Sequence, residues 1–288
     1  MDIKVIGVIG AGTMGHGIAQ VALQAGFQVL LGDVAKDILE KARSRIAFGL
    51  AKGVEKGKFS ETQKEEMFKN LTLATTLADF AAADFVIEAV AEDFSIKKGV
   101  LGELDRVCRP EVILATNTSS ISITKIAATT SRPSRVIGMH FFNPVLLMRL
   151  LEIIRGLATE EKTVAVTRQL AERLGKIPVE ANDSPGFLAN RILIPMINEA
   201  IYALMEGVGT AEAIDTVMKL GANHPMGPLA LADLVGLDVC LAVLRTLHEG
   251  FGDSKYRPCP LLVRMVEAGF LGQKTGRGFY SYEHTRKE

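Results

Sequence analysis

His140 and Glu152 are residue types that can move a proton together, and both belong to short apolar stretches of the chain. His140 follows Val136 to Met139, and Glu152 lies within Leu150 to Ile154. If these stretches form an antiparallel pair of strands, the two side chains can face each other. A carboxylate hydrogen-bonded to one imidazole nitrogen fixes the tautomer and stabilises the imidazolium, so the other nitrogen can exchange a proton with a substrate. The alternative is a structural histidine hydrogen-bonded to a backbone carbonyl beside an exposed glutamate, and the local sequence alone favours this alternative.

A glycine-rich turn near the start of the chain predicts a dinucleotide site. The sequence Gly10-Ala11-Gly12-Thr13-Met14-Gly15 lies between an apolar strand, Val5 to Ile9, and a helical pattern from Ile18 to Ala25. In such a turn the first glycine permits the tight bend, the second lets the backbone approach a pyrophosphate, and the third lets helix and strand pack closely. The free N–H groups and the positive dipole end of the helix would then hold the diphosphate.

An acidic residue, Asp33, ends the next predicted strand, Gln28 to Leu31, at the distance from the glycines that a dinucleotide fingerprint requires. Its carboxylate is placed to accept hydrogen bonds from the adenine-ribose hydroxyls, which suits NAD and repels the extra phosphate of NADP. The following residue is Val34 rather than an arginine that could bind this phosphate. A purely structural glycine turn is the alternative, but the combination of strand, helix and acid favours a site for NAD.

Polar side chains also follow two later apolar stretches of the chain. Asn117-Thr-Ser-Ser120 follows one of them, and Glu88 and Glu92 follow another, with Lys97 in the next predicted helix. Ligands of open α/β sheets sit beyond the C-terminal strand ends, so we expect the hydroxyls to contact a substrate oxygen and the glutamates to rim the cofactor cleft. The alternatives are an N-cap cluster for a helix at 122 to 128 and an ordinary charged loop and helix face.

The elements that would position these residues alternate between strand and helix. Helical stretches such as Ile96 to Arg106 and Ile123 to Thr129 separate most of the later strand signals, which are at 71–73, 85–87, 112–115, 136–139 and 150–154. This alternation predicts a mostly parallel, doubly wound sheet. The link at 142 to 148 is too short for a crossover, so the strands on either side of it should be antiparallel. A helix at 160 to 174 and a strand at 177 to 180 complete this domain.

A helical hairpin is predicted after the second strand. Lys36 to Val54 has a helical pattern that Gly57 ends, and Ser60 opens a second helix with Gln63 in a capping-box arrangement. Basic residues cluster at the turn between the two helices, namely Lys52, Lys56 and Lys58.

The remainder of the chain is helical in pattern from 187 to 276. We therefore expect a dinucleotide-binding domain at 1–184 and a helical domain at 185–288. Ser184 as N-cap, with Pro185 at the first helical position, predicts a helix start at this boundary.

The composition is that of an ordinary soluble globular protein. The 288 residues suffice for two domains, and 33 acidic residues balance 33 basic ones, so nothing draws the chain toward nucleic acid or anionic membranes. The three distant cysteines, Cys108, Cys240 and Cys259, predict a reducing compartment rather than disulfides or a metal site. No signal peptide precedes the first strand, and the most apolar stretch, Pro228 to Leu244, is too short and charged to span a bilayer. We expect a cytoplasmic protein, with this stretch as a buried or interface helix.

A series of motifs extends along the whole chain. They are Gly10-Ala-Gly-Thr-Met-Gly15, Glu88-Ala-Val-Ala-Glu92, Asn117-Thr-Ser-Ser120, Gly138-Met-His-Phe-Phe-Asn-Pro144, Asp183-Ser-Pro-Gly-Phe187 with Asn190-Arg191, Pro225-Met-Gly-Pro228 and Lys274-Thr-Gly-Arg-Gly-Phe-Tyr280. In this order they resemble the short-form L-3-hydroxyacyl-CoA dehydrogenase family, and most of all its bacterial members that act on 3-hydroxybutyryl-CoA. The motifs around His140 and Ser119 are far more specific than the glycines alone.

The resemblance implies a Rossmann-type NAD-binding domain with an inserted helical hairpin, followed by an all-α domain. It implies His140 as the catalytic acid and base, Glu152 as its orienting partner, and Ser119 and Asn190 as substrate-binding groups. The cofactor-binding residues would be Gly10, Gly12, Thr13, Met14, Gly15, Asp33, Glu92, Lys97, Ser119, Asn143 and Lys274. Coenzyme A would contact Lys52, Lys56 and Ser119. The family also uses a serine of the hairpin, and Gly49 stands where we expect it.

The implied activity is NAD-dependent oxidation of an (S)-3-hydroxyacyl-CoA of short chain, such as 3-hydroxybutyryl-CoA, or the reverse reduction of acetoacetyl-CoA. One alternative is a dehydrogenase of small free 3-hydroxy acids, which usually relies on a lysine base and needs no basic hairpin. Another is a non-catalytic NAD-binding protein, against which the intact catalytic set argues. The apolar helices at 187 to 244 exceed what a small domain buries, which together with the resemblance predicts a homodimer through the C-terminal domain.

Overall fold

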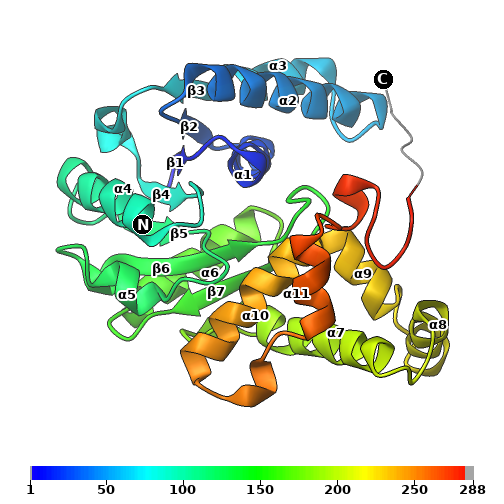
Figure 1. Cartoon of the computed structure of the whole chain (residues 1–288). Helices are drawn as coiled ribbons and strands as arrows, with labels where there is room; N and C mark the ends of the chain where they lie inside the picture. The colour runs from blue at the N-terminus through cyan, green and yellow to red at the C-terminus, as the bar shows by residue number, and fades with distance from the viewer. Residues whose placement is uncertain (1, 283–288) are drawn as a thin grey trace. The chain divides into compact units, whose positions relative to one another are not determined.

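The computed structural model describes residues 2–282, and the chain divides between Ser184 and Pro185 into two compact units. The first unit is built around an eight-stranded sheet, and the second is built from helices (Figure 1). The predicted fold class, a mostly parallel doubly wound sheet followed by a helical part, is therefore confirmed.

The sheet has the strand order β3-β2-β1-β4-β5-β6-β7-β8. Its strands are β1 (Val5–Ile9), β2 (Gln28–Gly32), β3 (Leu71–Ala74), β4 (Phe85–Glu88), β5 (Ile113–Thr116), β6 (Val136–Phe141), β7 (Leu150–Arg155) and β8 (Ile177–Asn182). Neighbouring strands are parallel except β6 and β7, which form the antiparallel pair that the short link between them predicts. The chain reverses its direction of travel across the sheet between β1 and β4, and open α/β sheets bind ligands at such a point.

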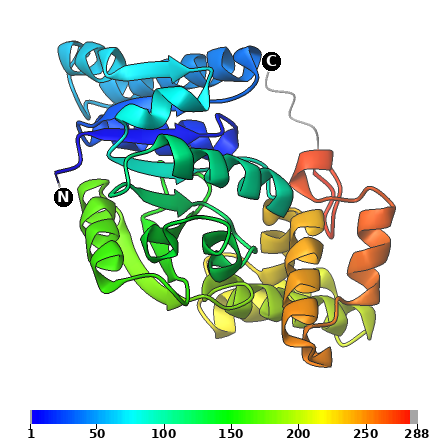
Figure 2. The same ribbon diagram turned by 90° about the vertical axis from the view of Figure 1, so that its left-hand side faces the viewer.

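Helices cover both faces of this sheet (Figure 2). On one face, α1 contacts β1 and β2, α6 contacts β6 to β8, and α2 packs on α1. Elsewhere α4 contacts η1, α5 and β5, while η1 also contacts β2 and β3, and α5 contacts β6. The bounds are α1 (Thr13–Gln24), α2 (Lys36–Glu55), α3 (Glu61–Lys69), η1 (Leu77–Ala82), α4 (Phe94–Val107), α5 (Ile123–Ala127), η2 (Pro133–Arg135) and α6 (Glu161–Arg173). The central strands β1 and β4 to β7 are buried on both sides, which explains why they are continuous apolar runs rather than alternating ones, whereas the edge strands β3 and β8 are partly exposed.

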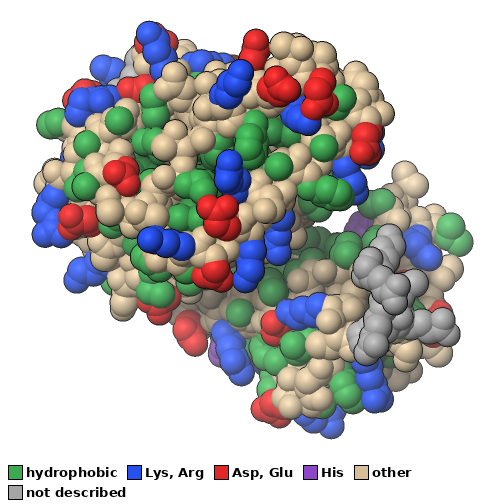
Figure 3. All heavy atoms as spheres, turned by 90° about the horizontal axis from the view of Figure 1, so that it is seen from above, with side chains coloured by type: hydrophobic (Ala, Val, Ile, Leu, Met, Phe, Trp, Pro, Cys, Tyr) green, Lys and Arg blue, Asp and Glu red, His purple; other side chains and the backbone are tan. Residues whose placement is uncertain are grey.

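The predicted helical hairpin is formed by α2 and α3. The Ser60 side chain accepts a hydrogen bond from the Gln63 backbone N–H, and the Gln63 side chain accepts one from the Ser60 N–H, so the predicted capping box is confirmed. Figure 3 looks down on this side of the molecule, where Lys and Arg side chains are interspersed with acidic and hydrophobic ones.

The second unit consists of five α-helices and short 3-10 turns within its described residues. Its elements are α7 (Ala189–Met205), α8 (Ala211–Gly221), α9 (Pro228–Val235), α10 (Leu237–Phe251), η3 (Ser254–Tyr256), α11 (Pro260–Glu267) and η4 (Gln273–Thr275). The apolar stretch Pro228 to Leu244, expected as one helix, is divided between α9 and α10. The division falls at Gly236, whose φ of 103° is outside the right-handed helical region. In the described part of the chain, none of the helices combines the length and apolar character needed to cross a bilayer.

The predicted helix start at Ser184 and Pro185 is wrong. The first helix of the second unit begins at Ala189, four residues later. Gly186 and Phe187 have φ values of 73° and 51°, in the left-handed region. A right-handed helix cannot include two such residues, so the chain makes a turn before α7 begins.

Candidate active site

The glycine turn after β1 has the geometry that a dinucleotide requires. Gly10 has a φ of 95°, and a Cβ there would lie 2.5 Å from the Ala89 carbonyl oxygen at the end of β4. A Cβ on Gly15 would lie 1.6 Å from the Gly10 carbonyl oxygen, so close packing of α1 on the turn demands a glycine. A Cβ on Gly12 would meet nothing within 4 Å. The turn is therefore tightly packed at its first and third glycines and open at the second.

This open position lies at the start of a helix that attracts anions. Gly12 is the N-cap of α1 and has no side chain to satisfy the first backbone N–H groups of the helix. These N–H groups and the positive end of the helix dipole suit a pyrophosphate. The residues present therefore fit the diphosphate of a dinucleotide.

Asp33 lies beside this turn, at the end of β2. One carboxylate oxygen accepts a hydrogen bond of 2.9 Å from the Ala11 N–H, and the other accepts one of 3.0 Å from the Ala35 N–H. Both bonds orient the carboxylate at the strand end, where a ribose would lie. The next side chain, Val34, is almost fully exposed and offers no charge to a second phosphate.

The sheet register brings His140 and Glu152 together. They are direct partners in the β6–β7 ladder, and His140 Nδ1 lies 2.7 Å from Glu152 Oε2. Both side chains are buried, with Glu152 only 1% exposed, and the imidazole ring packs 4.6 Å from the ring of Phe142. The exposed glutamate of the alternative interpretation is thereby excluded. A buried carboxylate on one imidazole nitrogen is the arrangement needed for a histidine that carries a proton.

A buried lysine that sequence reasoning missed holds the loop between these two strands. The Lys176 ammonium donates hydrogen bonds to the backbone carbonyls of Val145 and Met148. Burial lowers the pKa of Lys176. Val145 also packs against Gly17 of α1, where a Cβ would lie 3.0 Å from it. The loop is thus held between the cofactor helix and Lys176, and nothing in the local sequence around Lys176 signals this role.

A second buried ion pair lies at the ends of β4 and β5. Glu88 is completely buried, and it accepts hydrogen bonds from Lys97 Nζ at 2.8 Å, from the Val90 N–H at 2.7 Å and from Thr116 Oγ1 at 2.6 Å. The prediction that Glu88 rims the cleft is wrong, because this carboxylate lies beneath the surface. The alternative of an ordinary charged face is also wrong for Glu88 and Lys97, since such faces are solvated.

Glu92 connects this ion pair to the loop after β5. One of its oxygens lies 3.3 Å from Lys97 Nζ, and the other accepts hydrogen bonds from the backbone N–H groups of Ser119 and Ser120 and from the hydroxyl of Thr118. Burial alone would raise the pKa of Glu92, but the Lys97 ammonium and the hydroxyl donors outweigh it and lower the pKa. The carboxylate therefore organises the loop that carries Ser119. Residues 117–120 do not cap α5, whose N-cap is Ser122.

The other predicted site residues are distributed over both units. Lys52 lies near the end of α2 and Lys56 directly follows that helix, while Asn143 lies exposed in the loop after β6, before a cis bond to Pro144. Asn190 and Lys274 belong to the second unit, in α7 and η4. The Lys274 ammonium pairs with both carboxylate oxygens of Asp238.

A buried aspartate, missed at the sequence level, holds the segment that carries Lys274. Asp233 of α9 accepts hydrogen bonds of 3.0 Å from the Phe279 and Tyr280 backbone N–H groups. A Cβ on Gly278 would lie 1.9 Å from the Asp233 carboxylate, so only glycine allows this approach. Gly278 of the terminal motif therefore has a structural reason, which is to let the segment pack onto α9, whereas Gly276 is required by its left-handed φ of 73°.

Comparison with known proteins agrees with this geometry. Residues 5–184 match the NAD-binding domain of 3-hydroxyacyl-CoA dehydrogenase, and residues 186–282 match the C-terminal domain of the same family. A probable 3-hydroxybutyryl-CoA dehydrogenase of Bacillus subtilis is 57% identical over 98% of this chain and 99% of its own length. A 3-hydroxybutyryl-CoA dehydrogenase of Bradyrhizobium diazoefficiens is 54% identical over 97% of this chain and 96% of its own.

A solved structure shows the same likeness in three dimensions. The (S)-3-hydroxybutyryl-CoA dehydrogenase of Ralstonia eutropha superposes with a TM-score of 0.96 and 48% identity, covering 98% of this chain and all of the other. The resemblance inferred from the motifs is thereby confirmed. The chain belongs to the 3-hydroxyacyl-CoA dehydrogenase family, and its first unit is the NAD-binding domain of that family.

Proposed function

We propose that this protein is an (S)-3-hydroxybutyryl-CoA dehydrogenase that interconverts 3-hydroxybutyryl-CoA and acetoacetyl-CoA with NAD. The observation that carries the proposal is the buried His140–Glu152 pair, on the same sheet as the open glycine turn. The names of the relatives at 54% and 57% identity support the same substrate.

The proposed chemistry assigns one task to each side chain. NAD, when bound, supplies the acceptor for the hydride that leaves C3 of the substrate. His140 removes the proton of the 3-hydroxyl through Nε2, and Glu152 stabilises the imidazolium through Nδ1. Ser119 and Asn190 hydrogen-bond the substrate oxygen. In the reduction, the His140 imidazolium returns the proton to the ketone.

The proposed cofactor contacts extend beyond the glycine turn. Asp33 receives the adenine ribose, and Glu92, Asn143 and Lys274 line the remainder of the NAD site. Lys97 is expected there too, but it is buried and acts on this site through its ion pair with Glu92. Glu92 already binds the Ser119 loop, so one carboxylate links the proposed cofactor and substrate contacts.

An absorbance assay tests this proposal. Loss of NADH absorbance with acetoacetyl-CoA but not with acetoacetate is expected. Loss with acetoacetate instead would indicate a dehydrogenase of free 3-hydroxy acids, and no loss with either substrate would indicate a non-catalytic protein. The variant His140→Gln should lose a factor of about 10²–10⁴ in turnover, because that is the usual contribution of a positioned acid or base. Near-normal turnover in this variant would overturn the assignment of His140.

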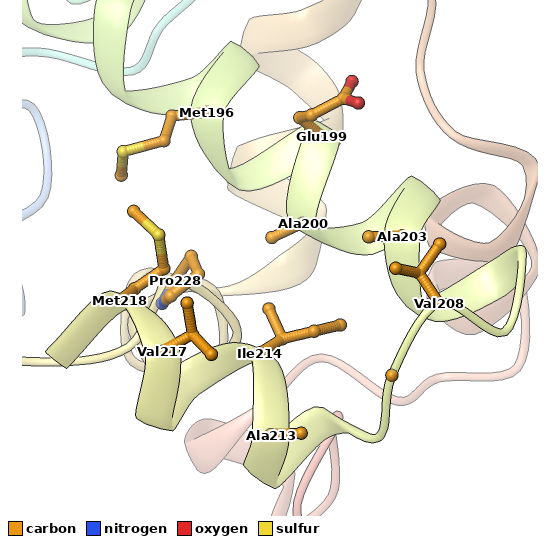
Figure 4. Close-up of a pocket in the computed structure, with 11 residues that line it drawn as sticks. Met196, Glu199, Ala200, Ala203, Val208, Ala213, Ile214, Val217, Met218 and Pro228 are labelled. Carbon is orange, nitrogen blue, oxygen red and sulfur yellow. The ribbon is translucent and has the colours of Figure 1, made fainter. Parts of the chain in front are cut away.

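We further propose a homodimer through the second unit. Helices α7 and α8 border an apolar cavity of about 520 Å³, into which Met196 and Met218 point from the two helices (Figure 4). Leu220 of α8 is 82% exposed, and further exposed apolar side chains of this unit are Ile192, Val208 and Val217. Exposed apolar patches often mark subunit interfaces. Sedimentation equilibrium should give twice the chain mass, and a monomer at assay concentrations would refute the dimer.

We also propose that the protein works in the cytoplasm. All three cysteines are buried free thiols. Burial raises the pKa of Cys108 to about 11 and that of Cys240 to about 12, so both stay protonated and unreactive at neutral pH. Cysteines remain free thiols mainly in reducing compartments such as the cytoplasm. Immediate alkylation of cell extract should label three thiols per denatured chain, and fewer would contradict this location.

A further inference from the structure

One face of α2 combines an exposed aromatic ring with basic side chains. Arg45, Phe48, Lys52 and Lys56 follow one another at spacings of three and four residues, which places them along one side of the helix. Phe48 is 62% exposed, and the Lys52 ammonium lies 4.4 Å from the centre of its ring. The core face of α2 lies elsewhere on the helix and is formed by Leu39, Ala42, Ile46, Leu50 and Gly53.

The cations on this face differ from others on the same helix in their pairing. Lys41 pairs with Asp37, and Arg43 pairs with Glu40. Within residues 2–282, no ion pair forms for Arg45, Lys52, Lys56 or the nearby Lys58; the only acidic residue between Arg45 and Lys58 is Glu55. The positive charges on this side of α2 and at its end are therefore not neutralised by acidic side chains of the described residues.

An exposed aromatic ring on a helix face that also carries cations without ion pairs matches the chemistry of a purine nucleotide. The base stacks on the ring, with a contribution to affinity of about tenfold or more, and the phosphates pair with the cations. A solitary Lys–Phe contact within a helix would account for Lys52 and Phe48, but it would leave the other unpaired cations unexplained.

We propose that Phe48 is the platform on which the adenine of coenzyme A stacks, beside the coenzyme A contacts of Lys52 and Lys56 that the family resemblance already implies. The inference rests on the proposed function, because it assumes a coenzyme A thioester as substrate. Position 49 makes no part of this site. A Cβ on Gly49 would lie 2.4 Å from the amide oxygen of the buried Gln20 of α1.

The test compares two thioesters that differ only in the nucleotide. Acetoacetyl-CoA carries the adenine nucleotide, and acetoacetyl-N-acetylcysteamine lacks it. In Phe48→Ala, we expect the KM for acetoacetyl-CoA to rise about tenfold, since one stacking contact is lost. Its kcat, the KM for NADH and the kcat/KM for the truncated thioester should stay at wild-type values. Phe48→Trp should restore the KM for acetoacetyl-CoA. Ile38→Ala is the control, because Ile38 is a partly exposed apolar residue of the same helix.

Direct binding separates this inference from the proposed function. Adenosine 3′,5′-bisphosphate, a nucleotide fragment of coenzyme A, should bind the wild-type protein in a calorimetric titration and bind Phe48→Ala about tenfold more weakly. Equal binding to both proteins, or equal losses of Phe48→Ala on the two thioesters, would overturn the role of Phe48. Binding of the fragment without turnover of either thioester would retain the nucleotide platform and overturn the proposed reaction.

Discussion

Replacing Glu152 with glutamine removes the charge beside His140 and keeps the length and shape of the side chain. Both side chains are buried, and the glutamine oxygen can still accept the 2.7 Å hydrogen bond from Nδ1. The variant should therefore keep the orientation of the ring and lose the electrostatic stabilisation of the imidazolium. This makes Glu152→Gln the sharpest probe of the proposed mechanism.

The size of the effect follows from the separation of the two charges. With charge centres about 4 Å apart and an effective dielectric constant of about 20, the attraction is ~4 kcal/mol. At about 1.4 kcal/mol for each factor of ten, this equals a factor of about 10³ in forming the imidazolium. The retained hydrogen bond reduces the loss, so we expect kcat for the oxidation of 3-hydroxybutyryl-CoA to fall by about 10²–10³.

The assay is NADH formation at saturating substrate and NAD. The KM for 3-hydroxybutyryl-CoA should stay within about threefold of the wild-type value, because the lost interaction strengthens only as the imidazolium forms. Glu180→Gln is the matched control, since Glu180 lies on β8 beside β7 but is half-exposed and paired with Arg168. A kcat for Glu152→Gln within about threefold of wild type would refute the reasoning. A loss in the control as large as that in Glu152→Gln would attribute the effect to the sheet rather than to the charge.

Three further perturbations follow from the structure. Gly12→Ala should weaken NADH binding at least about tenfold in a fluorescence titration, because its Cβ intrudes on the space for the pyrophosphate, while the melting temperature changes little because a Cβ there meets no protein atom within 4 Å. Lys176→Met should lower the free energy of unfolding by about 2–3 kcal/mol in urea, since two buried carbonyls lose a charged donor; an unchanged urea midpoint would contradict this role. Asp105→Asn tests pH dependence: burial raises the pKa of Asp105, but Ser131 and the Arg132 guanidinium outweigh it and lower the pKa. The Asp105 carboxylate thus stabilises the fold fully at pH values above the pKa that this group has in the unfolded chain. The stabilisation is lost as the pH falls through the lower pKa of the group in the folded protein. The variant should be about 2 kcal/mol less stable than wild type at pH 7, and this difference should shrink as the pH falls through the folded pKa; a difference that stays constant in acid would disprove the linkage.

Patterns local in the chain predicted most of the fold. The glycine turn, the capping box at Ser60 and the short link between β6 and β7 each depend on residues close in sequence, whose backbone preferences and spacing act locally. The local pattern gave a wrong prediction at Ser184, where the Ser-Pro pair predicts a helix start. Gly186 and Phe187 have left-handed backbone conformations, so the helix begins only after them.

The site depended on contacts that no local pattern contains. By itself, the sequence determined a doubly wound domain with a dinucleotide turn, because strand, turn and helix signals are read within a few neighbouring residues. Only the tertiary structure decided that His140 faces Glu152, that Glu88 is buried on Lys97, and that Lys176 holds the loop between the catalytic strands. The physical reason is that strand register and the packing of residues far apart in the chain decide whether a charged side chain is solvated or is buried against a partner. Neither can be read from neighbouring residues.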